Sequence, residues 1–311
     1  MELAGQRFVV TGGAGFIGSH LVDALLAQSA RVVVLDDLSY GSLDNLADAL
    51  PRIEFLQASI LDANALDHAL KDSAGVFHLA AVASVLKSID DPVQTHEINS
   101  TGTLQLFEIA RKCRRPPKIV FSSSAAVYGD DPVVPKRESM QVRPVNPYGT
   151  QKLLGELYLA NYHHVHGLSG VSLRYFNVYG PRQTPTNMYS GVVSAFCDRV
   201  KRGAEVTING DGGATRDFVF VADVARANLD AMLSRVNNAT TLNIGTGRRT
   251  SILDLAKMVH RIYGKEEAIV FGPERPGDIR HSYAEISEAS AEIGFKAAVE
   301  LSQGLARAVG R

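Results

Sequence analysis

The stretch YGTQK places a tyrosine and a lysine four residues apart, at Tyr148 and Lys152. On a helix this spacing puts both side chains on one face, about one turn apart. A tyrosine has an ordinary pKa near 10, so a phenolate at neutral pH needs a shift of about 3 units, roughly 4 kcal/mol. One positive charge about 4 Å away, at an effective dielectric of about 20, supplies a similar amount. The pair therefore predicts a basic phenol, although most Tyr–Lys pairs on helices belong to solvated faces.

Three consecutive serines, Ser122 to Ser124, end the apolar run KIVFSSS that precedes this pair in the chain. The carboxyl ends of strands are where open α/β sheets bind their ligands. Pro147 suits the first turn of a helix, because proline has no N–H and its φ is already helical. We therefore expect the serines at the binding edge of a sheet, and Tyr148 and Lys152 on a helix that begins near Pro147.

A second chemical feature is TGGAGFIGSH, which follows a short apolar run and fits both G-x-G-x-x-G and the wider G-x-x-G-x-x-G. Glycines are needed there for the sharp turn, for close approach to a pyrophosphate, and for tight packing of helix on strand. The N–H groups at the start of the following helix then face the phosphates. The expected cofactor contacts in this turn are Gly12, Gly15, Phe16, Ile17 and Gly18.

An acidic pair, Asp36 and Asp37, closes the next apolar run, RVVVLDD. A carboxylate at the end of the second strand accepts hydrogen bonds from the adenosine ribose and repels a 2′-phosphate, so NAD is favoured over NADP. The alternative is that both are ordinary loop acids. The strand, glycine turn and helix before them favour cofactor binding, more strongly for Asp36 than for Asp37.

Short apolar runs alternate with amphipathic segments through the first half of the chain. RFVVTGG, RVVVLDD, IEFLQAS, GVFHLAA, KIVFSSS and VSLRYFN are rich in Val, Ile, Leu and Phe, as buried strands are. The segments between them can hold the crossover helices that parallel strands require. After Tyr179 the alternation of apolar runs and amphipathic segments becomes less regular. The predicted fold class is therefore α/β, a doubly wound parallel sheet with a smaller C-terminal α/β lobe.

Composition narrows the function classes. The chain has 311 residues and a net charge of −1, so no electrostatic footprint for nucleic acid or an anionic membrane is present. Cys113 and Cys197 lack a CxxC spacing, which indicates a reduced, cytoplasmic setting. Met1 leads quickly into the first strand, so we expect no signal peptide. The histidines near residue 164 have no acidic or cysteine ligand close in sequence, so we expect no metal.

The ordered motifs TGGAGFIGSH, HLAA, INSTGT, SSSAAVYG, YGTQK, RYFNVYGPRQ, TRDFVFVADVA, LNIGTG and RPGDIRHS make the chain similar to the extended short-chain dehydrogenase/reductases, specifically the UDP-sugar 4-epimerases. The resemblance covers nearly the whole length and implies a Rossmann-like fold. It implies an NAD-binding domain over residues 1–176, with elements near 217–247 returning to it. Residues 177–216 and 248–311 would form the nucleotide-sugar-binding lobe.

The resemblance also implies roles for individual residues. The implied catalytic residues are Ser124, Tyr148 and Lys152. Beyond the glycine turn and the acidic pair, the implied cofactor contacts are Ser59, Ile60, Leu79, Ala80, Ala81, Asn99, Ser122, Tyr148, Lys152 and Tyr175. The implied substrate contacts are Ser84, Ser124, Asn177, Val206, Arg216, Arg275, Asp278 and Ser282. At Ser59 the family usually has an aspartate near the adenine, so that contact is in question here.

The chemistry implied by the resemblance is redox-neutral. Tyr148 would remove the proton of the sugar 4-hydroxyl while C4 gives its hydride to NAD, and the 4-keto sugar would turn over before hydride returns to its other face. NAD is then not consumed and should stay tightly bound, and its oxidised nicotinamide ring would be a second positive charge near Tyr148 besides Lys152. Related 4,6-dehydratases carry an Asp-Glu pair after the catalytic Ser or Thr, whereas this chain has Ala125 and Ala126. Alanine does no acid–base work, which disfavours elimination.

The sugar is indicated by Ser282, which aligns with a position where a bulky tyrosine limits some epimerases to non-acetylated sugars. Serine leaves room for an N-acetyl group, so UDP-GlcNAc and UDP-GalNAc are favoured over UDP-glucose, UDP-galactose or UDP-glucuronate, although a roomy pocket rejects a smaller group only weakly. A dehydratase or reductase and a non-catalytic NAD sensor are weaker alternatives. Family members commonly pair through the YGTQK helix and the one over Gln94 to Cys113, so we also expect a homodimer.

Overall fold

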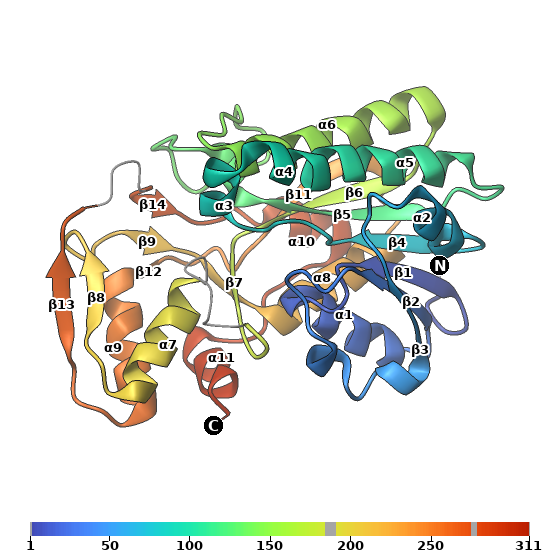
Figure 1. The fold of residues 1–311 in the computed structure, drawn as a ribbon. Helices are drawn as coiled ribbons and strands as arrows, with labels where there is room; N and C mark the ends of the chain where they lie inside the picture. The colour runs from blue at the N-terminus through green and yellow to red at the C-terminus, as the bar shows by residue number, and fades with distance from the viewer. Residues whose placement is uncertain (1, 184–190, 275–278, 311) are drawn as a thin grey trace.

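The computed structural model describes residues 2–183, 191–274 and 279–310. Its centre is a sheet of seven parallel strands in the order β11-β6-β5-β4-β1-β2-β3 (Figure 1). The strands are β1 (Arg7–Thr11), β2 (Arg31–Asp36), β3 (Ile53–Gln57), β4 (Gly75–His78), β5 (Lys118–Ser124), β6 (Gly170–Tyr175) and β11 (Asn238–Ile244). The predicted doubly wound α/β sheet is confirmed, and the strand order reverses between β1 and β4.

Helices cover both faces of this sheet, because strands that are apolar on both sides must be buried on both sides. One layer consists of α2 (Ala63–Leu70), α5 (Thr103–Lys112) and α6 (Pro147–His166). The other consists of α1 (Phe16–Ala27), α8 (Val221–Leu233) and α10 (Ser287–Ile293). The short helices α3 (Val85–Asp90) and α4 (Pro92–His96) connect β4 to the first layer, through a π-helical turn over Glu97–Gly102.

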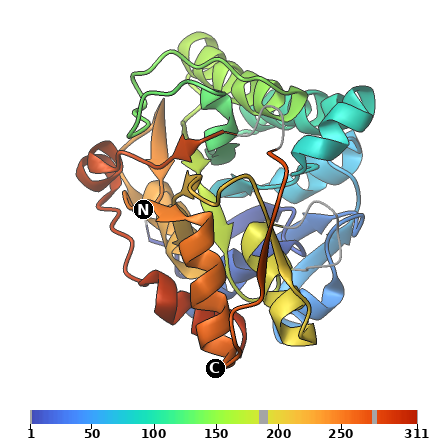
Figure 2. The same ribbon diagram turned by 90° about the vertical axis from the view of Figure 1, so that its left-hand side faces the viewer.

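A smaller lobe with its own apolar core lies beside the sheet. It contains α7 (Val192–Arg202), β8 (Val206–Asn209), α9 (Ile252–Tyr263), β13 (Ile269–Gly272) and α11 (Leu301–Ala308). Figure 2 views the molecule from this side, with α9 and α7 towards the viewer. A three-stranded sheet of β12 (Thr250–Ser251), β9 (Thr215–Arg216) and β14 (His281–Ser282) and a pair of β7 (Asn177–Tyr179) and β10 (Phe218–Phe220) lie between the lobes. Three 3₁₀ turns cover Leu43–Leu46, Leu50–Arg52 and Ala125–Tyr128.

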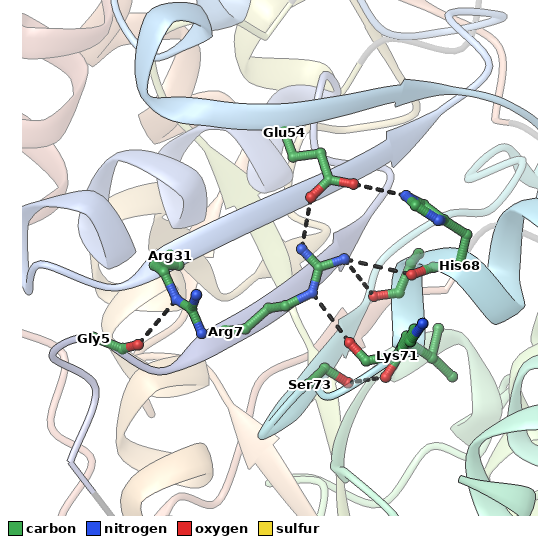
Figure 3. A network of polar contacts seen from close by, with 9 residues as sticks. Gly5, Arg7, Arg31, Glu54, His68, Lys71 and Ser73 are labelled. Atoms are coloured by element: carbon green, nitrogen blue, oxygen red, sulfur yellow. Dashed lines mark hydrogen bonds and ion pairs between the residues drawn. The ribbon is translucent and has the colours of Figure 1, made fainter.

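At the amino-terminal end of the strands, the guanidinium of Arg7, the first residue of β1, binds groups of neighbouring elements (Figure 3). It donates to the Glu54 carboxylate of β3 at 2.7 Å and to the carbonyl oxygen of Lys71, just after α2, at 3.2 Å. The Ser73 hydroxyl in the same turn donates to a helix carbonyl at 2.8 Å. These bonds join β1, β3 and α2 far from the cavity described next.

Candidate active site

A cavity of about 380 Å³ follows the carboxyl ends of the sheet strands. Every predicted cofactor residue except Asn99 lines it, and so do Ser84 and Ser124 from the predicted substrate contacts. The remaining described members of the predicted substrate set lie outside this lining: Asn177, Val206, Arg216 and Ser282. Arg275 and Asp278 lie outside the described residues. The cavity is thus lined by residues at the carboxyl ends of six strands, β1 to β6.

The glycine turn between β1 and α1 has no room for side chains. Gly12 has a φ of +71°, and a Cβ there would lie 2.7 Å from the backbone nitrogen of Ala80, after β4. A Cβ on Gly18 would collide with the carbonyl oxygen of Gly12. The turn is therefore pressed against both the start of α1 and the exit of β4. The first N–H groups of α1, at Phe16 and Ile17, have no partner within the helix and belong to residues that line the cavity.

Asp36 occupies the end of β2 and is nearly fully buried. Its Oδ2 accepts a hydrogen bond from the Ala14 N–H and its Oδ1 from the Leu38 N–H, both at 2.9 Å. Burial raises the pKa of Asp36, and these two N–H donors oppose the rise. Each carboxylate oxygen keeps a lone pair for a further donor. The neighbouring Asp37 is exposed and accepts bonds from the backbone and hydroxyl of Ser39 instead.

These features fit a dinucleotide. A glycine cradle that any Cβ would fill, helix N-terminal N–H groups and a carboxylate at the end of the second strand are the donors and acceptors that pyrophosphate and ribose need. Ser59 and Ile60 after β3 and Leu79 to Ala81 after β4 complete this part of the lining. The residues that would hold NAD are therefore on adjacent loops of one edge.

The chemical end of the cavity is built by packing α6 tightly on β5. A Cβ on Gly155 would lie 2.2 Å from the Cζ of Phe121, so only glycine permits this approach. Three serines of β5 then meet one face of α6. The Lys152 ammonium donates to the carbonyl oxygen of Ser122 at 2.9 Å, and the Ser123 hydroxyl donates to the Glu156 carboxylate. The Ser124 hydroxyl lies near the phenol of Tyr148 and interacts with it.

A buried ionic network continues from that carboxylate. Arg174 of β6 makes a two-pronged ion pair with Glu156, at 2.9 and 2.7 Å, and both side chains are 6% exposed. The same guanidinium donates to the Tyr128 hydroxyl at 3.0 Å, and Tyr128 donates to Asn243 of β11 at 2.6 Å. The network therefore ties α6 to β5, β6 and β11 directly behind the predicted catalytic residues.

The structure shows how the chain's own groups act on the pKa of Tyr148. In the chain itself burial raises this pKa, and the interaction with Ser124 lowers it only in part. Burial lowers the pKa of Lys152 to about 8, so at pH 7 this side chain is mainly protonated. Its Nζ lies 5.9 Å from the centroid of the Tyr148 ring and points at a β5 carbonyl. Lys152 therefore does not by itself hold Tyr148 as a phenolate.

Asn99 lies behind the cavity, in the π-helical turn. Its side chain accepts from the Val82 N–H at 2.8 Å, donates to the Val82 carbonyl at 3.2 Å, and donates to Gln151 of α6 at 2.8 Å. It therefore shapes the loop after β4 from behind. A direct contact with the cofactor stays a prediction.

The other predicted substrate residues fall into two groups. Arg216 and Ser282 face each other in the register of β9 and β14, so the structure brings these two together. The Asn177 N–H is bonded to the carbonyl of Asp217, which places it beside β10. The Val206 side chain is fully buried in the core of the small lobe, and the Val206 N–H donates to the Ala268 carbonyl. The predicted contact was one of the backbone, and it stays a prediction.

Several lining residues were missed by sequence reasoning. Tyr40 and Gly41 follow β2, and a Cβ on Gly41 would lie 2.9 Å from both Ala14 and the Asp36 carboxylate. Gln183, which follows β7, and Gly191, which precedes α7, also line the cavity. The glycine a few residues after Asp36 could have indicated Tyr40 and Gly41 as cavity residues. No feature of the sequence indicates Gln183 or Gly191.

Within the described ranges, no group of three or more His, Cys, Asp or Glu side chains is placed to hold a metal ion. Over the same residues, no helix is both long and apolar enough to cross a membrane. Cys113 and Cys197 are both free thiols.

Comparison with known proteins gives a consistent result. Residues 8–245 match the family described as NAD dependent epimerase/dehydratase. A putative UDP-glucose 4-epimerase of Methanocaldococcus jannaschii is 40% identical over 97% of this chain and 96% of its own length. The solved UDP-N-acetylglucosamine 4-epimerase of Methanobrevibacter ruminantium, in complex with UDP-N-acetylmuramic acid, is 38% identical, with a TM-score of 0.93 over 98% of this chain and 97% of that one. The UDP-glucose 4-epimerase of Thermus thermophilus in complex with NAD is 37% identical, with a TM-score of 0.89 and 98% coverage of both chains.

Proposed function

The chain belongs to the NAD-dependent epimerase/dehydratase family, and from this premise we propose that it interconverts UDP-N-acetylglucosamine and UDP-N-acetylgalactosamine by inversion at C4. The broader class is that of an isomerase, an NAD-dependent UDP-sugar 4-epimerase. The observation that carries the reaction is the arrangement of Ser124, Tyr148 and Lys152 at one end of a cavity whose other end fits NAD.

Tyr148 accepts the proton of the sugar 4-hydroxyl and later returns it, while Ser124 holds the same oxygen by a hydrogen bond. The Lys152 ammonium would stabilise a phenolate by about 3 kcal/mol, taking its 5.9 Å distance from the centroid of the Tyr148 ring as the charge separation and an effective dielectric of about 20. This is less than the roughly 4 kcal/mol that ionisation at neutral pH needs, and burial adds to the cost. When bound, NAD supplies the hydride acceptor and, in its oxidised form, a second positive charge.

The N-acetylated substrate is supported by the small side chain of Ser282, which lies beside Arg216 on the strand pair between the lobes. A serine there leaves space that a bulky residue would fill. The M. ruminantium neighbour is named for UDP-N-acetylglucosamine. UDP-glucose and UDP-galactose are the second candidate pair, because the M. jannaschii and T. thermophilus relatives are named for UDP-glucose.

The substrate is tested by incubating the protein with UDP-GlcNAc, UDP-GalNAc, UDP-glucose and UDP-glucuronate and resolving the products by proton NMR. Ser282→Tyr should remove activity on UDP-GlcNAc and spare UDP-glucose. Equal loss on both sugars would contradict the role given to Ser282. Tyr148→Phe should abolish turnover and leave bound NAD in place, whereas substantial residual epimerisation would contradict the role given to Tyr148.

We also propose that the protein is a homodimer that works in the cytoplasm. Large apolar side chains are exposed along α3, α4 and α6, among them Ile89 at 55%, Val93 at 70% and Leu157 at 51%. Exposed apolar side chains gathered on neighbouring helices are typical of surfaces that contact another protein. Light scattering after size exclusion should give twice the chain mass of 33.5 kDa, and a single monomeric species would contradict the dimer.

A further inference from the structure

The short helix α3 connects the cavity to the first turn of α6. Ser84 caps its N-terminus, accepts the Lys87 N–H at 3.1 Å, and lines the cavity. Ser88, one turn later, is fully buried. Its hydroxyl donates to the Val85 carbonyl at 2.6 Å and accepts the backbone N–H of Tyr148 at 3.0 Å. The donor hydrogen of Ser88 is therefore used within α3, which leaves its lone pairs for Tyr148.

The first N–H groups of a helix need acceptors from outside the helical ladder. In α6, Pro147 has no N–H, and the Gly149 N–H is bonded to the Asn146 side chain at 2.9 Å. Tyr148 is different, because its N–H is bonded to Ser88, which lies 60 residues earlier in the chain. The residue that carries the phenol thus has its backbone bonded to a separate element.

Packing holds the same turn from the other side. A Cβ on Gly149 would lie 2.7 Å from the carbonyl oxygen of Ala126, two residues after Ser124. The backbone of Tyr148 is therefore held between the 3₁₀ turn that follows β5 and the hydroxyl of Ser88. Small displacements of a reacting group are costly, since about 1 Å can lower a rate about 100-fold.

We propose that Ser88 is a positioning residue for the epimerisation, which keeps the Tyr148 phenol beside Ser124 by accepting the Tyr148 backbone N–H. The kinetic part of this inference rests on the proposed function. Ser88 itself touches neither the cavity nor the phenol oxygen, so it acts through the backbone of its neighbour.

The kinetic test uses Ser88→Ala and the isosteric pair Ser88→Thr and Ser88→Val. Removing the acceptor should lower kcat about 10- to 100-fold and change KM and NAD content less than about 2-fold. Ser88→Thr keeps a hydroxyl and should be several-fold faster than Ser88→Val, which has the same shape without it. Ser73→Ala is the matched control, because it removes another buried serine hydroxyl bonded to a helix carbonyl, far from the cavity. Its kcat should equal that of the wild type.

A second readout does not depend on turnover. Protein labelled with ¹⁵N-tyrosine has only ten tyrosine amide signals, and Tyr148→Phe assigns one of them. Exchange of the Tyr148 amide hydrogen should become about 10-fold faster or more in Ser88→Ala, and stay slow in Ser73→Ala, because only the first variant removes its acceptor. Ser88→Ala needs no extra room, so it serves even where the β-branched variants fail to fold.

The outcomes separate the two levels of the proposal. A wild-type kcat and unchanged Tyr148 exchange in Ser88→Ala would overturn it, and so would equal rates for Ser88→Thr and Ser88→Val. If the wild type epimerises no UDP-sugar, the proposed function fails. In that case the exchange experiment still decides whether Ser88 holds Tyr148.

Discussion

Replacing Glu156 by glutamine should destabilise the protein strongly, because Arg174 would keep its charge in a buried place without a counter-charge. Both side chains are 6% exposed, and the guanidinium reaches the carboxylate through two hydrogen bonds. Burial lowers the pKa of Arg174, and the carboxylate more than offsets this in the wild type. In the variant the guanidinium still keeps its proton at pH 7, because arginine is not deprotonated in proteins. Breaking one half of such a pair typically costs about 3–5 kcal/mol.

The expected shift in melting temperature follows from the size of the chain. An unfolding entropy of about 2.1 cal/mol/K per residue gives roughly 0.65 kcal/mol/K for 311 residues. A loss of about 4 kcal/mol therefore lowers Tm by about 6 °C. Scanning calorimetry of wild type and Glu156→Gln at pH 7 measures the difference.

Two controls sharpen the result. Replacing Glu156 and Arg174 together by methionine should recover at least half of the lost stability, because no charge then stays unpaired. Asp211→Asn breaks a two-pronged ion pair with Arg280, whose side chain is 50% exposed, while that of Asp211 is 62% exposed. Surface ion pairs contribute little to stability, so this variant should change Tm by no more than about 1 °C. A Glu156→Gln variant that melts within about 2 °C of the wild type would refute the reasoning. A double methionine variant less stable than the single one would do the same.

Three further predictions concern the cavity and its surroundings. Gly149→Ala should lower kcat about 10- to 100-fold in steady-state assays, since its Cβ would push the first turn of α6 away from Ala126; unchanged kinetics would contradict this packing. Burial lowers the pKa of His78 in the folded protein to about 3. Between pH 6.5 and pH 3 this histidine is therefore protonated in the unfolded chain but not in the folded one. Its contribution lowers the free energy of unfolding by about 1.4 kcal/mol for each pH unit of acidification. Urea unfolding between pH 7 and pH 5 should therefore depend less on pH in His78→Gln than in the wild type, and equal slopes would count against the assignment. Asp36→Asn should purify with little NAD, because the amide turns one acceptor oxygen into a donor beside two backbone N–H groups, whereas exposed Asp37→Asn should keep most of it; equal NAD contents on release by heat would rule this out.

The fold class and the nucleotide end could be predicted from the sequence because their signals are local. Apolar runs of strand length separated by helix-length segments indicate a parallel sheet, and the structure confirms seven parallel strands. The glycine turn requires particular residue types within a few positions of Gly12, and the helix at Pro147 begins where proline is tolerated. Such constraints operate between neighbours in the chain, so they can be read without knowing what packs against them.

For the chemical end of the cavity, the sequence predicted which residues take part but not how they contact one another. The sequence indicated that Ser124, Tyr148 and Lys152 belong together, but not that each serine of β5 has its own partner on α6. It indicated Lys152 as one positive charge near Tyr148, but the direction in which the ammonium points and the burial of both groups depend on the packed structure. Ser88 carried no signal at all.

The sequence by itself determined the order of strands and helices along the chain, the glycine turn, and the acid at the end of β2. Only the tertiary structure decided that Ser88 meets Tyr148 across 60 residues, and that Glu156 meets Arg174 of a neighbouring strand. The physical reason is the distance along the chain over which each kind of interaction acts. Backbone preferences and periodicity act over one or two helical turns, whereas the partner of a buried polar group depends on which elements the sheet order and the close packing of glycines bring together.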